Sequence, residues 1–324
     1  MVKRQILIPS VAFPRVEERL KVFGELDIAL WSPEATRRQD GTQISFSELT
    51  PEIAWIPIDM FFTGQFLEFV EVFLTTGSVK WVQACLAGTD APPFHQIQKA
   101  GIRLSNSDSP NAGVAEYIIS SVLNVVHKWP ERQKQQAEQR WVQEGWREIG
   151  EMKWLVVGFG SIGGELAKRA RAFGSEVVGA RRTRVVDNRA TKMITMAELH
   201  NELPNADIVI IACPLNDETR GLVDENFLSQ MNPESILVNV ARGPVVNTKA
   251  LLTALDRNEL NHAILDVFDA EPLDSVSPLW HHPSVTMTSH IAGAGSGITS
   301  RGDNVFIEQL TEYLAGRPLR LEVK

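Results

Sequence analysis

Cysteine is scarce in this sequence: Cys85 and Cys213 are the only two among 324 residues. Two cysteines provide no disulfide framework, so we expect two reduced thiols. Long apolar runs are also missing. The apolar run at residues 6–8 is too short for a signal peptide and predicts a first strand, and no stretch reaches the ~20 residues of a membrane span. These absences exclude a disulfide scaffold and a membrane protein, and they favour the cytoplasm.

Basic residues are fewer than acidic ones, 32 against 40, which gives a formal net charge of −8. Nucleic-acid binding needs a basic face that displaces counterions from phosphates, so we expect no such partner. We also predict no metal site. Apolar residues make up 44% and charged residues 22% of the chain, as in globular proteins, and the length suits two domains.

Short strand patterns alternate with helical ones in the first third of the chain. Residues 105–110 are polar and prone to turns, which predicts a hinge between domains. A helix is expected at 112–129 from the apolar spacing of Val114, Ile118, Val122 and Val125. The expected strands of this part are 5–8, 53–57 and 80–84, and the expected helices are 66–75 and 93–100.

Residues 131–146 are rich in Gln and charge, and Trp141 and Trp146 stand near their end. Pro130 interrupts the preceding helix. The segment is either an exposed loop or an arm that packs on a partner subunit, since exposed tryptophan is enriched at interfaces.

Regular alternation of short apolar strands and helices follows, which predicts a parallel sheet with right-handed crossovers. Strands buried on both faces have this composition. We expect them at 153–157, 176–179, 208–212, 236–240, 263–267 and 285–288.

Gly158, Gly160 and Gly163 form a G-x-G-x-x-G pattern after the strand at 153–157 and before a helix. In this context the first glycine permits a tight turn, the second lets the backbone approach a pyrophosphate, and the third lets helix and strand pack closely. The helix N-terminus then attracts the anion. The pattern predicts dinucleotide binding; the alternative is a glycine-rich turn of another α/β protein.

The end of the next strand bears on the choice of cofactor. NAD enzymes place an acidic residue there for the ribose 2′-hydroxyl. Here Arg181, Arg182, Thr183 and Arg184 follow Ala180, and arginines bind a 2′-phosphate by charge-assisted forks. We therefore predict NADP over NAD. The alternative is a solvated basic turn that accepts either cofactor.

Arg242, Glu271 and His290 follow three predicted strands, whose carboxyl ends share one edge of a parallel sheet. Reduction of a 2-oxo acid needs a proton donor, which suits histidine, and a carboxylate orients the ring and favours its charged form. A guanidinium grips the substrate carboxylate. Each residue alone has an ordinary structural explanation. Together, downstream of a nucleotide turn, they predict hydride transfer.

The segments 238–244, 265–273 and 287–293, which contain these three residues, resemble the D-isomer-specific 2-hydroxyacid dehydrogenase family, as do 156–163 and the run 212–222. The resemblance extends from about residue 79 onward. It implies an α/β protein in which a Rossmann-type doubly wound parallel sheet, residues 105–290, is inserted into a smaller flavodoxin-like substrate domain, residues 1–104 and 291–324. It also implies an NAD(P)-dependent oxidoreductase acting on CH–OH groups, and a homodimer.

By position, His290 resembles the acid/base, Glu271 its partner and Arg242 the substrate anchor. Asp266 resembles a contact to the nicotinamide carboxamide. The loop Leu86, Ala87 and Gly88 resembles the one whose N–H groups bind the substrate carboxylate. The cofactor residues implied in addition to the three glycines and Arg181 to Thr183 are Phe159, Ser161, Ile162, Cys213, Pro214, Val240, Ala241, Asp266, His290 and Gly293.

The chain departs from the family's pattern at Leu86, where a small polar residue is common, and at Ser289, where a proline is common. Glyoxylate or hydroxypyruvate is the substrate class that the resemblance implies. The alternatives are a phosphoglycerate-type dehydrogenase and a dinucleotide-sensing protein like the corepressors of this fold. The sequence offers no basic pocket for a phosphate, which argues against the phosphoglycerate-type enzyme. It has no long disordered tails, which argues against a corepressor-like protein.

Overall fold

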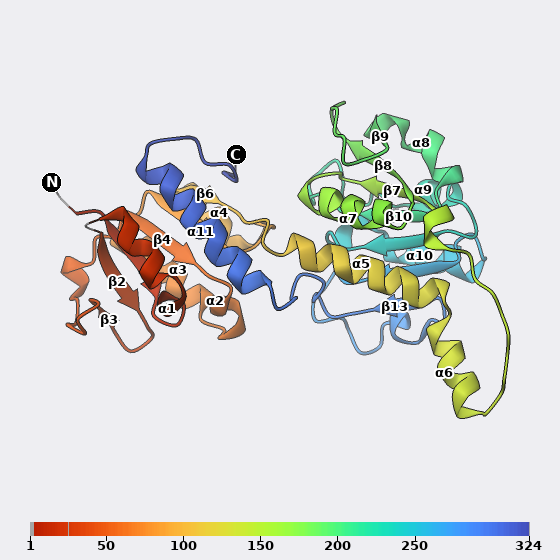
Figure 1. The fold of residues 1–324 in the computed structure, drawn as a ribbon, viewed down its shortest axis with the longest axis horizontal. Helices are drawn as coiled ribbons and strands as arrows, with labels where there is room; N and C mark the ends of the chain where they lie inside the picture. Colours follow the sequence, from red (N-terminus) through yellow and green to blue (C-terminus); the bar gives the residue numbers. More distant parts are fainter. Residues whose placement is uncertain (1–2, 25, 324) are drawn as a thin grey trace. The chain divides into compact units, whose positions relative to one another are not determined.

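The computed structural model describes residues 3–24 and 26–323, and its contacts divide the chain into two compact units. The first unit combines residues 1–110 with 296–324, and the second comprises residues 111–295 (Figure 1). Residues 1–2 and 324, the ends of the substrate domain expected from the sequence, lie outside the described residues.

The unit boundaries fall after residues 110 and 295, later than the positions after 104 and 290 that the sequence suggests. Local hydrogen bonds explain both shifts. The N–H group of Asn106 donates to the carbonyl of Leu321 at 3.0 Å, which ties the expected hinge to the first unit. The N–H group of Ile291 donates to the carboxylate of Asp266 at 2.9 Å, which ties the turn after residue 290 to the second.

The first unit contains a six-stranded sheet in the order β3-β2-β1-β4-β5-β6. All neighbours are parallel except β2 and β3. Without the edge strand β3 this is the flavodoxin-like order. The strands are β1 (Gln5–Pro9), β2 (Asp27–Trp31), β3 (Thr36–Arg37), β4 (Ile53–Ile56), β5 (Trp81–Ala84) and β6 (Arg103–Ser105).

Helix α11 (Ile298–Leu314) returns the chain to this sheet, drawn in blue across the red and orange unit in Figure 1. Phe306 of α11 stacks on Trp55 of β4 with ring centroids 4.2 Å apart, and Tyr313 stacks on Trp81 of β5 at 4.7 Å. These aromatic pairs fix the helix on one sheet face. The other helices of the unit are α1 (Phe13–Leu20), α2 (Asp59–Phe62), α3 (Phe66–Thr76) and α4 (Pro92–Lys99).

The second unit contains a seven-stranded parallel sheet in the order β13-β12-β11-β10-β7-β8-β9. This is the Rossmann order with one strand added, and the strand order reverses between β7 and β10. The strands are β7 (Lys153–Val157), β8 (Glu176–Arg181), β9 (Lys192–Thr195), β10 (Ile208–Ile211), β11 (Ile236–Asn239), β12 (His262–Leu265) and β13 (Val285–Met287).

Helices cover this sheet because its strands are apolar on both faces. The buried side chains of α5 pack with those of α7 and with the fully buried Trp154 of β7. Among the described residues, no helix is both long and apolar enough to cross a membrane. The helices of the unit are α5 (Asn111–Val126), α6 (Trp129–Ala137), α7 (Ser161–Ala172), α8 (Leu199–Glu202), α9 (Glu225–Ser229) and α10 (Thr248–Asp256).

The main local difference from the sequence prediction lies at residues 126–147. The helix expected at 112–129 ends at Val126, and α6 begins at Trp129 with Pro130 in its first turn, where a missing N–H costs nothing. Lys128 adopts a left-handed conformation, φ 51°, between the two helices. Proline therefore starts a second helix here, in a segment for which the sequence suggested a loop or arm.

Candidate active site

The glycine turn lies at the carboxyl end of β7, at the point where the strand order reverses. Gly158 has a φ of +89°, and a Cβ atom there would lie 2.4 Å from the backbone of Cys213, so only glycine fits. The N–H groups of Gly158 and Phe159 both donate to the carbonyl of Ala180. The turn is thus clamped between β8 and the segment after β10.

The other two glycines differ in what surrounds them. A Cβ atom at Gly160 would meet nothing closer than a carbonyl oxygen at 3.9 Å, which leaves the backbone before α7 open to a ligand. At Gly163 it would press on Phe159 at 3.0 Å and Val156 at 3.1 Å, so this glycine serves helix–strand packing. Ser161 opens α7, whose first N–H groups are arranged for an anion. The turn therefore fits a dinucleotide pyrophosphate.

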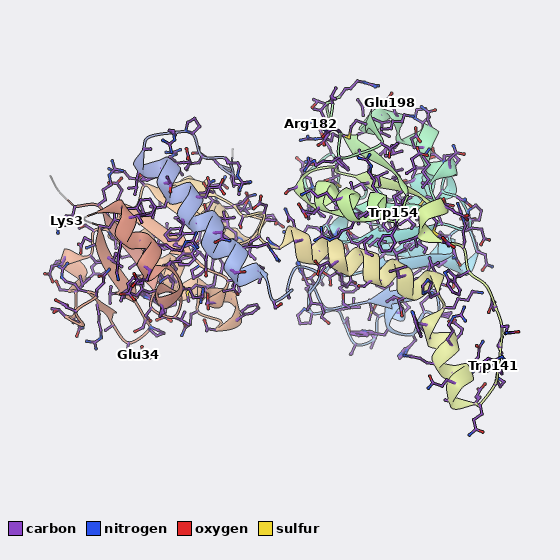
Figure 2. The ribbon with its side chains drawn as sticks, viewed as in Figure 1. Lys3, Glu34, Trp141, Trp154, Arg182 and Glu198 are labelled. Carbon is purple, nitrogen blue, oxygen red and sulfur yellow. The ribbon has the colours of Figure 1, made fainter. Side chains whose placement is uncertain are left out.

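Three exposed arginines surround the end of β8. Arg184 pairs with Glu198 at 2.5 Å. Hydrogen bonds from Thr195, together with this contact, lower the pKa of Glu198 to about 2. Among the described residues, the guanidinium groups of Arg181 and Arg182 have no hydrogen bond or ion pair (Figure 2 labels Arg182 and Glu198). They remain available for a phosphate.

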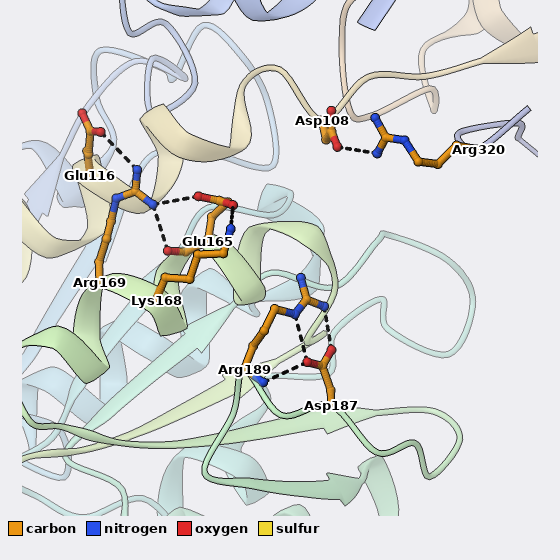
Figure 3. Close-up of polar contacts among 8 residues, drawn as sticks. All are labelled: Asp108, Glu116, Glu165, Lys168, Arg169, Asp187, Arg189 and Arg320. Atoms are coloured by element: carbon orange, nitrogen blue, oxygen red, sulfur yellow. Dashed lines mark hydrogen bonds and ion pairs between the residues drawn. The ribbon is translucent and has the colours of Figure 1, made fainter. Parts of the chain in front are cut away.

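A fourth arginine stabilises the loop that follows. Arg189 donates to Asp187 through Nε at 2.9 Å and Nη2 at 2.6 Å (Figure 3), and this pairing lowers the pKa of Asp187. Its guanidinium lies 5.7 Å from the ring centre of Phe159 and directly against Gly164. Arg189 therefore links the loop after β8 to the first turns of α7.

His290 and Glu271 form the central polar pair of the second unit. The Nδ1 atom of His290 lies 2.7 Å from a carboxylate oxygen of Glu271, and the other oxygen accepts the N–H of Phe268 at 3.0 Å. Both side chains are partly exposed, 48% for His290 and 37% for Glu271. With Nδ1 engaged, Nε2 is the ring nitrogen that remains for a substrate.

The backbone of His290 is held in an uncommon conformation. Its φ is +55°, in the left-handed region that non-glycine residues rarely adopt. The carbonyl of Asp266 accepts its N–H at 2.8 Å, and the buried Asp266 carboxylate accepts the N–H groups of Ile291 and Ala292 at 2.9 Å each. Asp266 thus positions the histidine, a contribution that the resemblance did not indicate.

Thr288 and Tyr117 complete this support and were not predicted as site residues. The hydroxyl of Thr288 donates to Asp266 at 2.5 Å, and it lies 2.8 Å from the hydroxyl of Tyr117 on α5. Burial raises the pKa of Tyr117. Thr288 ends the strand expected at 285–288, whereas Tyr117 gave no signal because its partner lies far along the chain.

Arg242 lies beside the same region of the second unit. Gly243 packs so closely on Phe268 that a Cβ atom would lie 1.9 Å from its carbonyl carbon, which brings the Arg242 backbone next to the loop that carries Glu271. The guanidinium donates to the carbonyl of Ala241 at 2.7 Å, and Asn239 donates to the carbonyl of Arg242 at 3.1 Å.

The remaining predicted cofactor residues follow neighbouring strands. Cys213 and Pro214 come after β10, and Val240 and Ala241 come after β11. Burial raises the pKa of Cys213 to about 11, so this thiol is protonated near neutral pH. Ile162 belongs to α7, Thr183 follows β8, and the Gly293 carbonyl packs near Gly113.

The predicted substrate loop belongs to the first unit, unlike the residues above. Leu86 follows β5, and its carbonyl accepts the N–H of Ser107 at 2.9 Å, while that of Ala87 accepts the side-chain amide of Asn106 at 2.9 Å. These bonds fix the loop that contains Gly88. Within the described part of the chain, no cluster of His, Cys, Asp or Glu has the arrangement of a metal site.

Comparison with known proteins identifies the family. Residues 119–292 match the model for the D-isomer specific 2-hydroxyacid dehydrogenase, NAD binding domain. The chain belongs to this family. It is therefore an NAD(P)-dependent oxidoreductase that acts on CH–OH groups, as the sequence predicted. The residues that match the NAD-binding domain lie within the second unit.

Individual relatives agree with this assignment. Glyoxylate/hydroxypyruvate reductase A of Salmonella paratyphi B is 33% identical over 215 residues, which cover 65% of this chain and 68% of that protein. A family member from Aeromonas salmonicida superposes with a TM-score of 0.78 at 24% identity, with 99% of both chains covered. A second, from Xanthobacter autotrophicus, has a TM-score of 0.76 at 24% identity and covers 100% of this chain and 98% of that one. The α/β fold that the sequence predicted is confirmed.

Proposed function

We propose that this dehydrogenase is an NADPH-preferring reductase of small 2-oxo acids. The observation that carries the proposal is the His290–Glu271 pair, which stands near Arg242 in the same unit as a glycine turn fitted to a dinucleotide. Such a set provides a proton donor, its orienting carboxylate and an anchor for a carboxylate.

The chain's own residues have distinct tasks in this mechanism. The bound dinucleotide supplies the hydride for the carbonyl carbon of the substrate. His290 donates a proton from Nε2 to the carbonyl oxygen, and Glu271 holds the ring through Nδ1 and stabilises its charged form. Arg242 binds the substrate carboxylate and polarises the carbonyl.

The preference for NADPH rests on Arg181 and Arg182. Two exposed guanidinium groups that have no hydrogen bond or ion pair in the described chain suit a 2′-phosphate, and the acid that accepts a ribose hydroxyl in NAD enzymes is missing after β8. The Xanthobacter autotrophicus structure was solved in complex with NADPH, which supports the same choice.

Glyoxylate and hydroxypyruvate are the first acids to test, because the Salmonella relative is named for them. The phosphoglycerate-type alternative is disfavoured by the lack of Lys or Arg at residues 81–92, around the predicted substrate loop. A dinucleotide sensor of this fold would bind the cofactor without turnover, so an activity assay distinguishes it.

A homodimer formed through the arm at residues 131–146 completes the proposal. Lys128 pairs with Glu144 at 2.6 Å, and Trp146 packs on His127 with ring centroids 4.8 Å apart, so the end of the arm folds back on the residues that precede it. Trp141 is left 91% exposed (Figure 2). A large exposed tryptophan is typical of an interface residue.

The deciding experiment measures oxidation of NADPH and of NADH with a panel of 2-oxo acids. We expect steady turnover with NADPH, and a higher kcat/KM for NADPH than for NADH. Tight binding of NADPH without turnover of any 2-oxo acid would favour the sensor. Turnover with a phosphorylated substrate alone would favour the phosphoglycerate-type alternative.

A further inference from the structure

The acid/base pair shares a cavity with hydrophobic side chains. Glu271 and His290 line a cavity of about 280 Å³ in the second unit together with Phe268, Leu273, Trp280 and Met287. Among the residues that the structure describes, no lysine or arginine lines it. A second carboxylate or a phosphate there would find no countercharge other than His290, which Glu271 already pairs, so its burial is costly.

Most polar groups in the wall of this cavity already have a hydrogen-bond partner. The hydroxyl of Thr288 is bonded to Asp266, and the Nε1 atom of Trp280 donates to the carbonyl of Asp274 at 2.9 Å. Besides the acid/base pair, Ser289 contributes the one remaining polar side chain among the described lining residues. A substrate hydroxyl entering this cavity would exchange water for mostly hydrocarbon neighbours.

Hydrocarbon side chains also surround the predicted substrate loop of the first unit, which is a separate observation. Leu86, which replaces the small polar residue common in the family, packs against a cluster formed by Ile58, Cys85 and Ile298, with Phe61 at its edge. These residues follow the carboxyl ends of β4 and β5 or open α11. The predicted substrate loop of the first unit is thus bordered by hydrocarbon.

We propose that this enzyme prefers 2-oxo acids with a hydrocarbon side chain of two or more carbons over hydroxypyruvate and glyoxylate, and that the side chain lies in the cavity lined by Leu273 and Trp280. This rests on the proposed function and specifies its substrate. When an apolar pocket buries one additional methylene of a substrate, the ratio of kcat/KM between the longer and the shorter substrate rises by about 10- to 200-fold.

A matched pair of substrates tests the preference directly. 2-Oxobutyrate and hydroxypyruvate differ by a methyl group in place of a hydroxyl group. With saturating NADPH we expect kcat/KM for 2-oxobutyrate to exceed that for hydroxypyruvate by about 10- to 100-fold, the range for a hydroxyl in an apolar pocket. The kcat/KM for 4-methyl-2-oxopentanoate should exceed that for glyoxylate by at least the same factor.

Leu273→Asn tests whether the substrate side chain lies in this cavity, because it makes a half-buried wall residue polar at similar size. We expect kcat/KM for 2-oxobutyrate divided by kcat/KM for hydroxypyruvate to fall by about 10-fold or more. Leu252→Asn is the matched control: Leu252 is also half-buried but lines a different surface cavity, so the ratio should stay as in wild type.

Trp280→Ala is the second variant, since a side chain that is 47% exposed can be removed without emptying the core. It should lower kcat/KM for 4-methyl-2-oxopentanoate more than for glyoxylate. A wild type that prefers hydroxypyruvate would overturn this inference while leaving the reductase proposal intact. A hydrocarbon preference that survives in both cavity variants would overturn the location, and no turnover with any 2-oxo acid would reject both proposals.

Discussion

At the scale of single residues, the proposed chemistry depends on the contacts that fix each side chain in place. His290 has a left-handed backbone conformation and a ring fixed by Glu271, and Asp266 binds the backbone on both sides of it. Such strain persists where surrounding bonds over-determine a conformation. The turn is therefore built to present one ring nitrogen.

His290→Ala removes the proposed proton donor. We expect kcat for a 2-oxo acid to fall by about 10²- to 10⁴-fold, the usual contribution of general acid catalysis, while the Kd for NADPH changes little. Steady-state kinetics and fluorescence titration of NADPH measure the two quantities. His200→Ala, on the exposed face of α8, should leave both unchanged. Near wild-type turnover in the His290 variant would reject the assignment.

Replacing Arg181 and Arg182 together by Gln tests the cofactor preference. We expect KM for NADPH to rise by about 10- to 100-fold, because charge-assisted hydrogen bonds to the 2′-phosphate are lost, while KM for NADH stays within about threefold. Arg184→Gln is the matched control, since Arg184 is already paired with Glu198. An equal loss for both cofactors would contradict a 2′-phosphate site.

At the scale of elements, the strands of the second unit form the core and also place the candidate site residues along one edge of the sheet. Their carboxyl ends place the glycine turn, the arginines after β8 and the residues after β11 and β12 along one edge of the sheet. One strand also buries an ionisable group: His262 of β12 contacts the hydroxyl of Thr286 on β13 at 2.9 Å.

Stability should fall in mild acid because of His262. Burial lowers its pKa from 6.5 to about 4, and nearby His282 acts in the same direction. The unfolded chain then binds a proton more readily than the folded one, so stability is complete above pH 6.5 and is lost as pH falls toward 4, by up to about 3 kcal/mol.

Thermal melting between pH 7 and pH 4.5 measures this effect. His262→Gln keeps a hydrogen-bonding group but does not titrate, and it should flatten the dependence of Tm on pH in this range. His200→Gln, at an exposed position on α8, should melt with the same pH dependence as wild type. An unchanged pH dependence in the His262 variant would show that another group is responsible.

At the scale of the whole molecule, the arm is the feature that a single chain leaves unexplained. Its base is tied by the contacts of Arg132 with Trp146 and of Lys128 with Glu144, yet Trp141 contributes no burial. A protein retains such a side chain at low cost when a partner covers it.

Trp141→Ala should weaken self-association, because loss of a central interface tryptophan typically costs 2 kcal/mol or more, about a 30-fold change in the dimer Kd. Sedimentation velocity over a range of concentrations measures it. Phe173→Ala, which removes another exposed aromatic side chain at the end of α7, is the control and should not alter the distribution. A wild-type chain that sediments as a monomer at every concentration would refute the homodimer.

The sequence alone determined the fold class, the glycine turn and the family, because strand periodicity, glycine spacing and motif residues are local properties of the chain. It missed α6, since Pro130 marks both the end of one helix and the beginning of another. Only the tertiary structure showed Asp266 and Thr288 supporting His290, and the hydrocarbon walls around Glu271. Those contacts join residues far apart in the chain, and they exist only after the sheet has set its strands side by side.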